Sequence, residues 1–235
     1  MTKIQVEMID SMGTDLSVVN AARVSFSKES EWEEGPDTYY AGGEYKTTGS
    51  FILSDKDTRL IRFLARERHE IPFAHTAITL RVKAPIFVAR QAYKHKIGFV
   101  ENEISRRYVA DEPEFYLPDV WRSRAEDKKQ GSGGTHRNSS EWSVEYNWFL
   151  HRALGLYQRM IDDGVAPEQA RMILPQSMMT EWIWTGSLLA YARFYNLRSK
   201  TDAQKEIQII AAKVDKIMSV LYPVSWNALC KGGTQ

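Results

Sequence analysis

The chain has 235 residues, 43% hydrophobic and 26% charged, which is the balance of an ordinary soluble globular protein with room for a sizeable core. Its formal net charge of +1 excludes an overall field that would favour nucleic acid or an anionic membrane, so any anion binding must be local. A single cysteine, Cys230, excludes intrachain disulfides and a cysteine metal cage. Because we find neither an apolar run of roughly 18 residues nor a signal-peptide core, we expect a cytoplasmic protein.

The first predicted elements are a strand and two helices. Residues 4–9 (IQVEMI) alternate apolar and polar side chains, which indicates a strand, and helical spacing follows from Asp15. Residues 28–50 carry glycine, acidic and aromatic residues without a period, so we expect a long loop or a short hairpin there. Ser54 and Asp57 then have the spacing of a capping-box variant, which predicts that a helix begins at this point.

A second strand and a third helix follow a turn at HEIPFAH. Residues 76–83 (TAITLRVK) alternate with period two, so Ile78 and its apolar neighbours are expected on one face of a strand. Pro85 is suited to the first turn of the next helix, PIFVARQAYK. The stretch 90–108 is therefore predicted to be a helix end that runs into a loop.

The second half is predicted to be extended at first and then helical. Residues 111–119 (DEPEFYLPD) are punctuated by proline, and 123–140 form a polar excursion rich in glycine and serine. The remainder has four predicted helical segments: 141–163, 167–174, 177–195 and 202–222. We therefore expect one domain over residues 1–235, of the α+β class, with an antiparallel sheet and flanking helices.

The stretch 90–108 concentrates charge in an otherwise nearly neutral chain. Cations at both ends surround His95 and a central group of polar side chains: Arg90, Lys94, Lys96, Arg106 and Arg107 outside, and Glu101, Glu103 and Ser105 inside. Cations around a loop with free backbone N–H groups suit a phosphate. A solvated surface of paired charges is the open alternative, and such pairs contribute only about 0–1 kcal/mol.

Other candidate residues are isolated in the sequence. His69 and His75 bracket a turn but lack the third ligand and the spacing of a zinc motif, so we expect no metal. Arg171 and Arg198 sit among apolar residues and must reach either water or an anion. Cys230 has no histidine nearby in sequence and is expected to be structural.

Several motifs taken together identify a family. In order, HEIPFAH, VKAPIFVARQ, NEISRRY, EFYLP, ARMILP and NLR with AQKEI resemble the flavin-dependent thymidylate synthases (ThyX) over residues 15–215. The family signature is an Arg-His-Arg triplet with a serine after seven intervening residues. Here the triplet is Lys94-His95-Lys96, and eight residues precede Ser105. Further departures from the family pattern near the flavin are Ala74, Ser187, Arg193 and Asp202.

The resemblance implies a ThyX-like fold, a homotetramer with shared active sites, and synthesis of dTMP from dUMP. Methylenetetrahydrofolate would give the carbon, FADH2 the hydride, and NADPH would reduce the flavin. Carried over by position, the dUMP contacts would be Gln91, Lys94, Glu103, Ser105, Arg106, Arg107, Arg171 and Arg198. The FAD contacts would be His69, Lys94, His95, Lys96, Glu103, Ser187, Arg193 and Asp202.

This chemistry dispenses with a cysteine nucleophile, because fixed positive groups can stabilise charge as it develops on the uracil oxygens. We expect Arg198 to act on the ring, Arg107 on the phosphate, and Arg171 to reach in from a neighbouring subunit. Ser105 is expected to position the substrate and His69 to act beside the flavin. Two rival functions remain open: flavin- and folate-dependent hydroxymethylation of a pyrimidine deoxynucleotide, and, less favoured by the charge, a nucleic-acid binding module.

Overall fold

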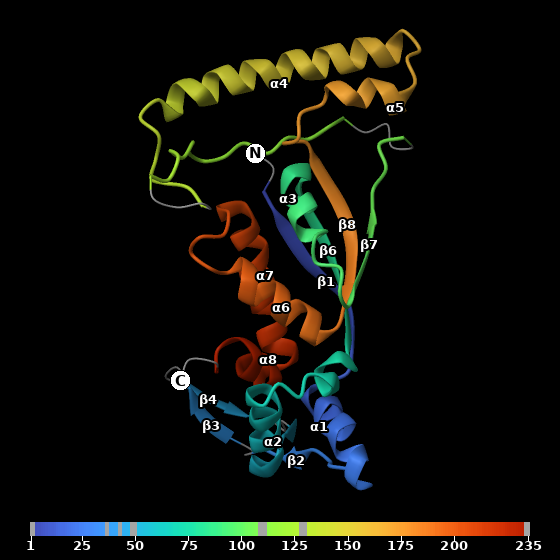
Figure 1. Ribbon diagram of the computed structural model, residues 1–235, viewed down its shortest axis with the longest axis vertical. Coiled ribbons are helices and arrows are strands. Elements are labelled where there is room, and N and C mark those ends of the chain that lie inside the picture. The colour runs from blue at the N-terminus through green and yellow to red at the C-terminus, as the bar shows by residue number, and fades with distance from the viewer. Residues whose placement is uncertain are drawn as a thin grey trace.

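The computed structural model describes residues 3–35, 38–41, 44–47, 51–107, 112–126 and 131–232. Its centre is a four-stranded antiparallel sheet in the order β1 (Gln5–Met12), β6 (Ala77–Pro85), β8 (Met179–Gly186) and β7 (Phe99–Glu103). Helices lie against this sheet and beyond its ends (Figure 1). The expected combination of helices with an antiparallel sheet is confirmed. In the described part of the chain, no helix is both long and apolar enough to span a membrane.

The strand β6 has the alternation that the sequence indicates. Ile78, Leu80 and Val82 are fully buried, and they face the helices that form the core. Three of these helices come from the C-terminal part of the chain: α6 (Leu188–Arg198), α7 (Lys205–Leu221) and α8 (Pro223–Cys230).

The strand β8 corrects the prediction of a helix over 177–195. Residues 179–186 (MTEWIWTG) alternate buried and half-buried positions, with Trp182 and Trp184 buried. Threonine, isoleucine and tryptophan favour a strand, and β6 and β7 hold β8 on both sides. The helix begins only at Leu188, after the strand has ended.

Gly186 allows β7 to approach β8 closely. It pairs with Phe99 on one side and Ile78 on the other, and a Cβ atom built at Gly186 would collide with the Phe99 ring. That ring stacks on Trp184 with 4.4 Å between ring centroids. Glycine at this position therefore makes room for the aromatic layer of the sheet.

The strand β7 also corrects a prediction, because residues 99–103 were expected to be loop. The charged side chains of β7 hide the alternation of apolar and polar residues that indicates a strand. Because β7 lies at the edge of the sheet, it can carry Glu101 and Glu103 without burying them fully. The preceding helix, α3 (Ile86–Ala92), begins one residue later than expected, since Pro85 ends β6 and serves as the N-cap.

Two helices of the N-terminal half are joined by an ion pair between Arg23 and Asp57. The helices α1 (Asp15–Arg23) and α2 (Asp55–Arg66) follow the expected pattern, and the Ser54 hydroxyl accepts a hydrogen bond from the Asp57 N–H at 3.1 Å. Between these helices lie a short 3-10 helix, η1 (Val24–Phe26), and two small antiparallel pairs. Of the two forms expected for 28–50, the structure shows a hairpin in which β3 (Thr38–Ala41) pairs with β4 (Glu44–Thr47). A separate pair joins β2 (Glu33–Glu34) to β5 (Phe51–Ile52), and residues 36–37, 42–43 and 48–50 lie outside the described residues.

The Asp57 carboxylate ties this hairpin region to both helices. It is 3% exposed and accepts hydrogen bonds from Arg23 Nε at 3.0 Å and from the Ser30 and Ser54 hydroxyls at 3.1 and 2.9 Å. Burial opposes ionisation, but these donors and the charge of Arg23 lower the pKa of Asp57 below its usual value.

A long helix lies apart from the C-terminal helices. It is α4 (Ser139–Asp162), followed by α5 (Pro167–Ala170) and a 3-10 turn, η3 (Arg171–Ile173), at one end of the molecule (Figure 1). The predicted stop at Gly164 is confirmed by its left-handed φ of +84°. Of the predicted excursion at 123–140, residues 127–130 lie outside the described residues.

Candidate functional site

The clearest cluster of predicted site residues joins the ends of α3 and α6. Arg198, the last residue of α6, donates from Nε to His95 Nε2 at 2.9 Å and from Nη2 to the Gln91 carbonyl oxygen at 3.4 Å. His95 lies in the turn after α3, and its ring meets Phe194 edge-on with 5.1 Å between centroids. Gln91 and His95, about a hundred residues before Arg198 in the sequence, thus hold one half-buried guanidinium group.

Burial sets the protonation of this cluster. It lowers the pKa of His95 to about 4, with the charge of Arg198 adding to the effect, and it also lowers the pKa of Arg198. Since arginine can only donate, the lone pair of His95 faces Nε of Arg198, and a neutral imidazole carries its proton on Nδ1. His95 therefore fixes Arg198 in place while leaving the positive charge with the arginine.

A second group of predicted residues follows β7. Glu103 accepts a hydrogen bond from the Thr180 hydroxyl at 2.6 Å, which holds it against β8. Two residues later, the Ser105 hydroxyl accepts from the backbone N and Nε of Arg107 at 3.4 and 3.3 Å. The structure also brings in Tyr93, which sequence reasoning missed: burial and the Glu103 charge raise its pKa strongly, so it remains a phenol.

The cations around this group differ in exposure. Lys94 is exposed in the turn after α3, and Lys96 pairs with Glu101 and lies 5.9 Å above the Tyr93 ring. Arg106 is half-buried. The pairing of Lys96 with Glu101 agrees with the alternative that this stretch is a solvated surface of paired charges. The half-buried contact of His95 with Arg198 does not agree with that alternative.

The residues expected at a flavin form a less compact set. His69 is exposed and its ring meets Phe63 edge-on, and the next residue, Glu70, pairs with Arg193 of α6. Ser187 caps α6 by accepting from the Ala190 N–H at 3.2 Å.

One further contact relates this set to the Lys94-His95-Lys96 triplet. The Ser187 N–H donates to the Gly98 carbonyl at 3.3 Å, just beyond Lys96. Asp202 is exposed in the turn between α6 and α7. Lys94 and Lys96 are exposed after α3, and ammonium groups of this kind suit the phosphate of a flavin nucleotide.

Arg171 lies away from these clusters. It is exposed at the start of η3 and donates from Nε to the Glu168 carbonyl at 3.3 Å. Within the described residues it makes no hydrogen bond or ion pair with Gln91, His95 or Arg198.

Sequence reasoning missed a series of hydrogen-bonded polar side chains that begins at Gln91. Gln91 Nε2 donates to Gln204 Oε1, and Gln204 Nε2 donates to Glu206 Oε2 at 2.9 Å. Arg122 Nη2 donates to Glu206 Oε1 at 2.6 Å. Burial and the Glu206 charge raise the pKa of Tyr116 to about 12. The signal was present in AQKEI, where Gln204 and Glu206 stand at the start of helix α7.

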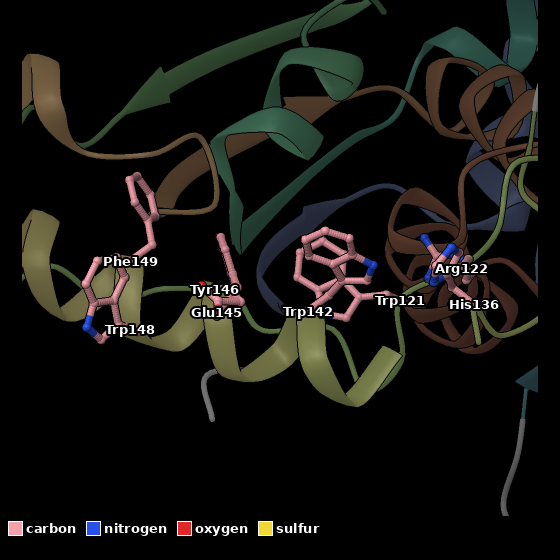
Figure 2. A pocket seen from close by; sticks show the side chains of 8 residues that line it. All are labelled: Trp121, Arg122, His136, Trp142, Glu145, Tyr146, Trp148 and Phe149. Atoms are coloured by element: carbon pink, nitrogen blue, oxygen red, sulfur yellow. The ribbon is translucent and has the colours of Figure 1, made fainter. Parts of the chain in front are cut away.

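Three of these side chains, Arg122, Gln204 and Glu206, line a cavity of about 480 Å³ together with Tyr116. A neighbouring cavity of about 490 Å³ lies along α4, where Figure 2 shows Trp142 and Tyr146 beside Trp121, with Arg122 and His136 at one end. Neither cavity is lined by the predicted nucleotide residues, so a well-formed hollow alone does not mark the reactive centre.

The arrangement can bind and polarise an anion or a carbonyl group, and its thiol is poorly suited to nucleophilic attack. Cys230 lies on α8, where burial, with a contribution from Asp215, raises the pKa of its thiol to about 12. No grouping of three or more His, Cys, Asp or Glu residues suited to a metal occurs in the parts of the chain that the structure describes. Fixed cations such as Arg198 are groups in this arrangement that can stabilise developing negative charge.

Known proteins are similar to this chain in sequence and in fold. A family model described as "Thymidylate synthase complementing protein" matches residues 7–224. The flavin-dependent thymidylate synthase of Thermosipho melanesiensis is 35% identical over 95% of this chain and 89% of its own, and that of Thermotoga neapolitana is 36% identical over 96% and 90%. Among solved structures, the UMP/dUMP methylase PolB from Streptomyces cacaoi, bound with 5-Br dUMP, has 32% identity and a TM-score of 0.79, covering 97% of this chain and 94% of its own.

Proposed function

The chain belongs to the flavin-dependent thymidylate synthase family, the thymidylate synthase complementing proteins, and on this premise we propose that it methylates dUMP to dTMP. The observation that carries the proposal is the Arg198 guanidinium, held half-buried between His95 Nε2 and the Gln91 carbonyl. A neutral imidazole leaves that guanidinium its full charge. Such a preorganised donor stabilises negative charge on a ring oxygen where water is scarce.

The nucleotide is proposed to lie between Arg198 and the turn after β7. In this arrangement Arg107 and the backbone of residues 105–107 hold the phosphate, and Ser105 positions it. Glu103 accepts from a ring or sugar donor, while Lys94 and Arg106 add positive charge. Activation of uracil C5 then needs no thiolate, which agrees with the raised pKa of Cys230.

The flavin is proposed to be FAD, held by the Lys94-His95-Lys96 triplet and by residues near α6. Lys94 and Lys96 present ammonium groups to the pyrophosphate, while His69, His95, Ser187, Arg193 and Asp202 contact the remainder. Bound flavin would supply the hydride, NADPH would reduce it, and methylenetetrahydrofolate would provide the carbon. The chain's own contribution is to orient these groups and to hold a fixed positive charge beside the pyrimidine.

We also propose a homotetramer with shared sites. The helix α4 buries only Leu150, Ala153 and Tyr157 within its own chain, while Trp142 and Trp148 are 51% and 58% exposed. Apolar surface of this kind on a long helix is commonly covered by another copy. Arg171, which within the described part of the chain makes no hydrogen bond or ion pair with Arg198, would then reach a neighbour's nucleotide.

A second substrate is favoured by one comparison. The structural neighbour PolB is named a UMP/dUMP methylase, and its structures hold 5-Br dUMP and 5-Br UMP. Methylation of UMP is therefore a candidate beside dUMP. Hydroxymethylation of the same pyrimidine is a third outcome, since it uses the same flavin and folate.

The test is product identification by mass. Purified protein is supplied with FAD, NADPH, methylenetetrahydrofolate and either dUMP or UMP. A methylated product from dUMP supports the proposal, whereas a hydroxymethylated product or turnover of UMP alone would replace it. Absence of any product, together with no binding of FAD or of either nucleotide, would refute it.

A further inference from the structure

A directional chain of hydrogen bonds ends on Gln91. Arg122 donates to Glu206 at 2.6 Å, Glu206 accepts from Gln204 at 2.9 Å, and Gln204 accepts from Gln91 Nε2. Arg122 is itself held by Ser132, whose hydroxyl accepts from Arg122 Nε at 2.8 Å. These contacts join α3, the start of α7 and the segment before α4 that carries Arg122 and Ser132, and we call them the amide relay.

The direction of the amide relay follows from its charged end. A guanidinium only donates and a carboxylate only accepts, so Glu206 must receive an N–H from Gln204. Glu206 is 3% exposed, and reversing the Gln204 amide would place a carbonyl oxygen against that buried carboxylate. The Gln204 oxygen is therefore turned towards Gln91, and Gln91 must donate a hydrogen bond to it from its NH2 group.

Gln91 is thereby left with a carbonyl oxygen that faces away from Gln204. Among the described residues, Gln91 Oε1 receives no hydrogen bond, and the main chain of the same residue is held by Arg198. We infer that Gln91 presents a fixed acceptor to the nucleotide, and that Gln204 is a positioning residue that sets this polarity. The inference rests on the proposed function.

The matching group on the ligand is a donor. A dUMP molecule offers the N3–H of the uracil ring and the 3′ hydroxyl of the sugar, and both share the chemistry that Gln91 Oε1 requires. A misoriented Gln91 would place its NH2 against that donor and leave both unpaired, which costs more than loss of the bond itself. The fixed orientation of the Gln91 amide would therefore favour binding of a nucleotide that carries the donor.

The experiment measures a ratio of affinities in the flavin-loaded protein. Dissociation constants are determined for dUMP, for 3-methyl-dUMP, which lacks the ring donor, and for 2′,3′-dideoxyuridine monophosphate, which lacks the sugar donor. Gln204→Met keeps the length of the side chain but removes its polarity. Gln208→Met is the control on the same helix, because Gln208 donates to the Lys200 and Ala203 carbonyls, accepts from Lys205 and lies outside the amide relay.

The expected result is that Gln204→Met weakens dUMP binding roughly five- to tenfold and lowers the preference over one analogue by the same factor. Gln208→Met should preserve both preferences. The analogue that loses its disadvantage identifies the donor. An unchanged preference over both analogues in Gln204→Met would overturn the inference.

A variant of Gln91 keeps the test decisive if Gln204→Met fails to fold or to load flavin. Gln91→Leu removes the acceptor and should lose the wild-type preference for dUMP over that analogue. A leucine variant that still prefers dUMP as the wild type does would also overturn the inference. If wild-type protein binds neither dUMP nor UMP, the proposed function fails first, so the two failures are distinguishable.

Discussion

The Nε–H of Arg198 donates to Nε2 of His95 across 2.9 Å, and this contact joins the end of α6 to the turn after α3. The imidazole acts as an acceptor and therefore restrains the guanidinium without neutralising it. A carboxylate in the same place would hold the arginine equally well but would cancel the charge that a pyrimidine oxygen needs. The choice of histidine thus favours a free cation in a half-buried site.

Replacement of Arg198 should abolish turnover and spare the flavin. We expect Arg198→Ala to lower kcat/KM by roughly 100- to 1000-fold, because a preorganised donor to developing charge is lost. FAD absorbance of the purified variant should match that of the wild type. Arg66→Ala, an exposed arginine paired with Glu67, is the control and should keep its activity. Wild-type turnover in Arg198→Ala would remove this residue from the mechanism.

The pKa of His95 makes stability depend on pH. In the folded protein this pKa is about 4, against an ordinary value of 6.5, so between these values the unfolded chain binds a proton that the folded chain does not. Stability from this residue is therefore present above about pH 6.5 and is lost as the pH falls towards 4.

The variant His95→Gln tests this dependence, because it cannot titrate. The difference in Tm between wild type and variant should be largest above pH 7 and should shrink at pH 5. A difference that stays constant from pH 8 to pH 5 would contradict the assigned pKa.

Asp57 should be a stability residue with no part in turnover. Asp57→Asn leaves Arg23 buried beside a neutral amide, and we expect a loss on the order of 3 kcal/mol in the free energy of unfolding, measured with urea. Since the pKa of Asp57 is lowered, the contribution of its charge should be present above pH 4 and fade at lower pH. Asp55→Asn, an exposed first-turn residue of α2, should cost far less; equal losses would mean that the ion pair is not what matters.

The exposed face of α4 should control assembly. We expect Trp148→Glu to reduce the molecular mass measured by light scattering and to lower activity with it, because a charge would enter an apolar contact. Asn147→Glu places the same charge on a different side of the helix and should leave the assembly intact. If the wild type is already a monomer with full activity, the proposed tetramer is wrong.

The Cys230 thiol should be inert. With a pKa of about 12, it is almost wholly protonated at pH 8, and a thiol reagent should modify native protein much more slowly than unfolded protein. Cys230→Ala should retain turnover. An inactive Cys230→Ala variant that binds FAD normally would restore a role for the thiol.

Much of the fold is predictable where one face of an element is buried. The strand β6 shows clean alternation at Ile78, Leu80 and Val82, and α2 announces its start through Ser54. The strand β7 was missed because an edge strand can carry glutamates outward, and β8 was missed because its apolar run was taken for part of the following helix. Local pattern alone does not say how many neighbours a segment will have.

The candidate site divides in the same way. Family motifs brought Gln91, His95 and Arg198 to attention, and the fold places them in contact. The partners Gln204 and Glu206 were missed, because their importance lies in a contact across more than a hundred residues of chain. Sequence spacing reveals which side chains carry the chemistry and leaves hidden those that orient them.

Position 186 constrains how this protein can diverge. With the Phe99 ring packed against the bare backbone of Gly186, even a methyl group there would push β7 away from β8 and carry the Ser105 turn with it. A lineage that lost this glycine would have to shrink residue 99 in the same step. Covariation of these two sites, rather than drift at either one alone, is the mark that the aromatic layer should leave on descendant sequences.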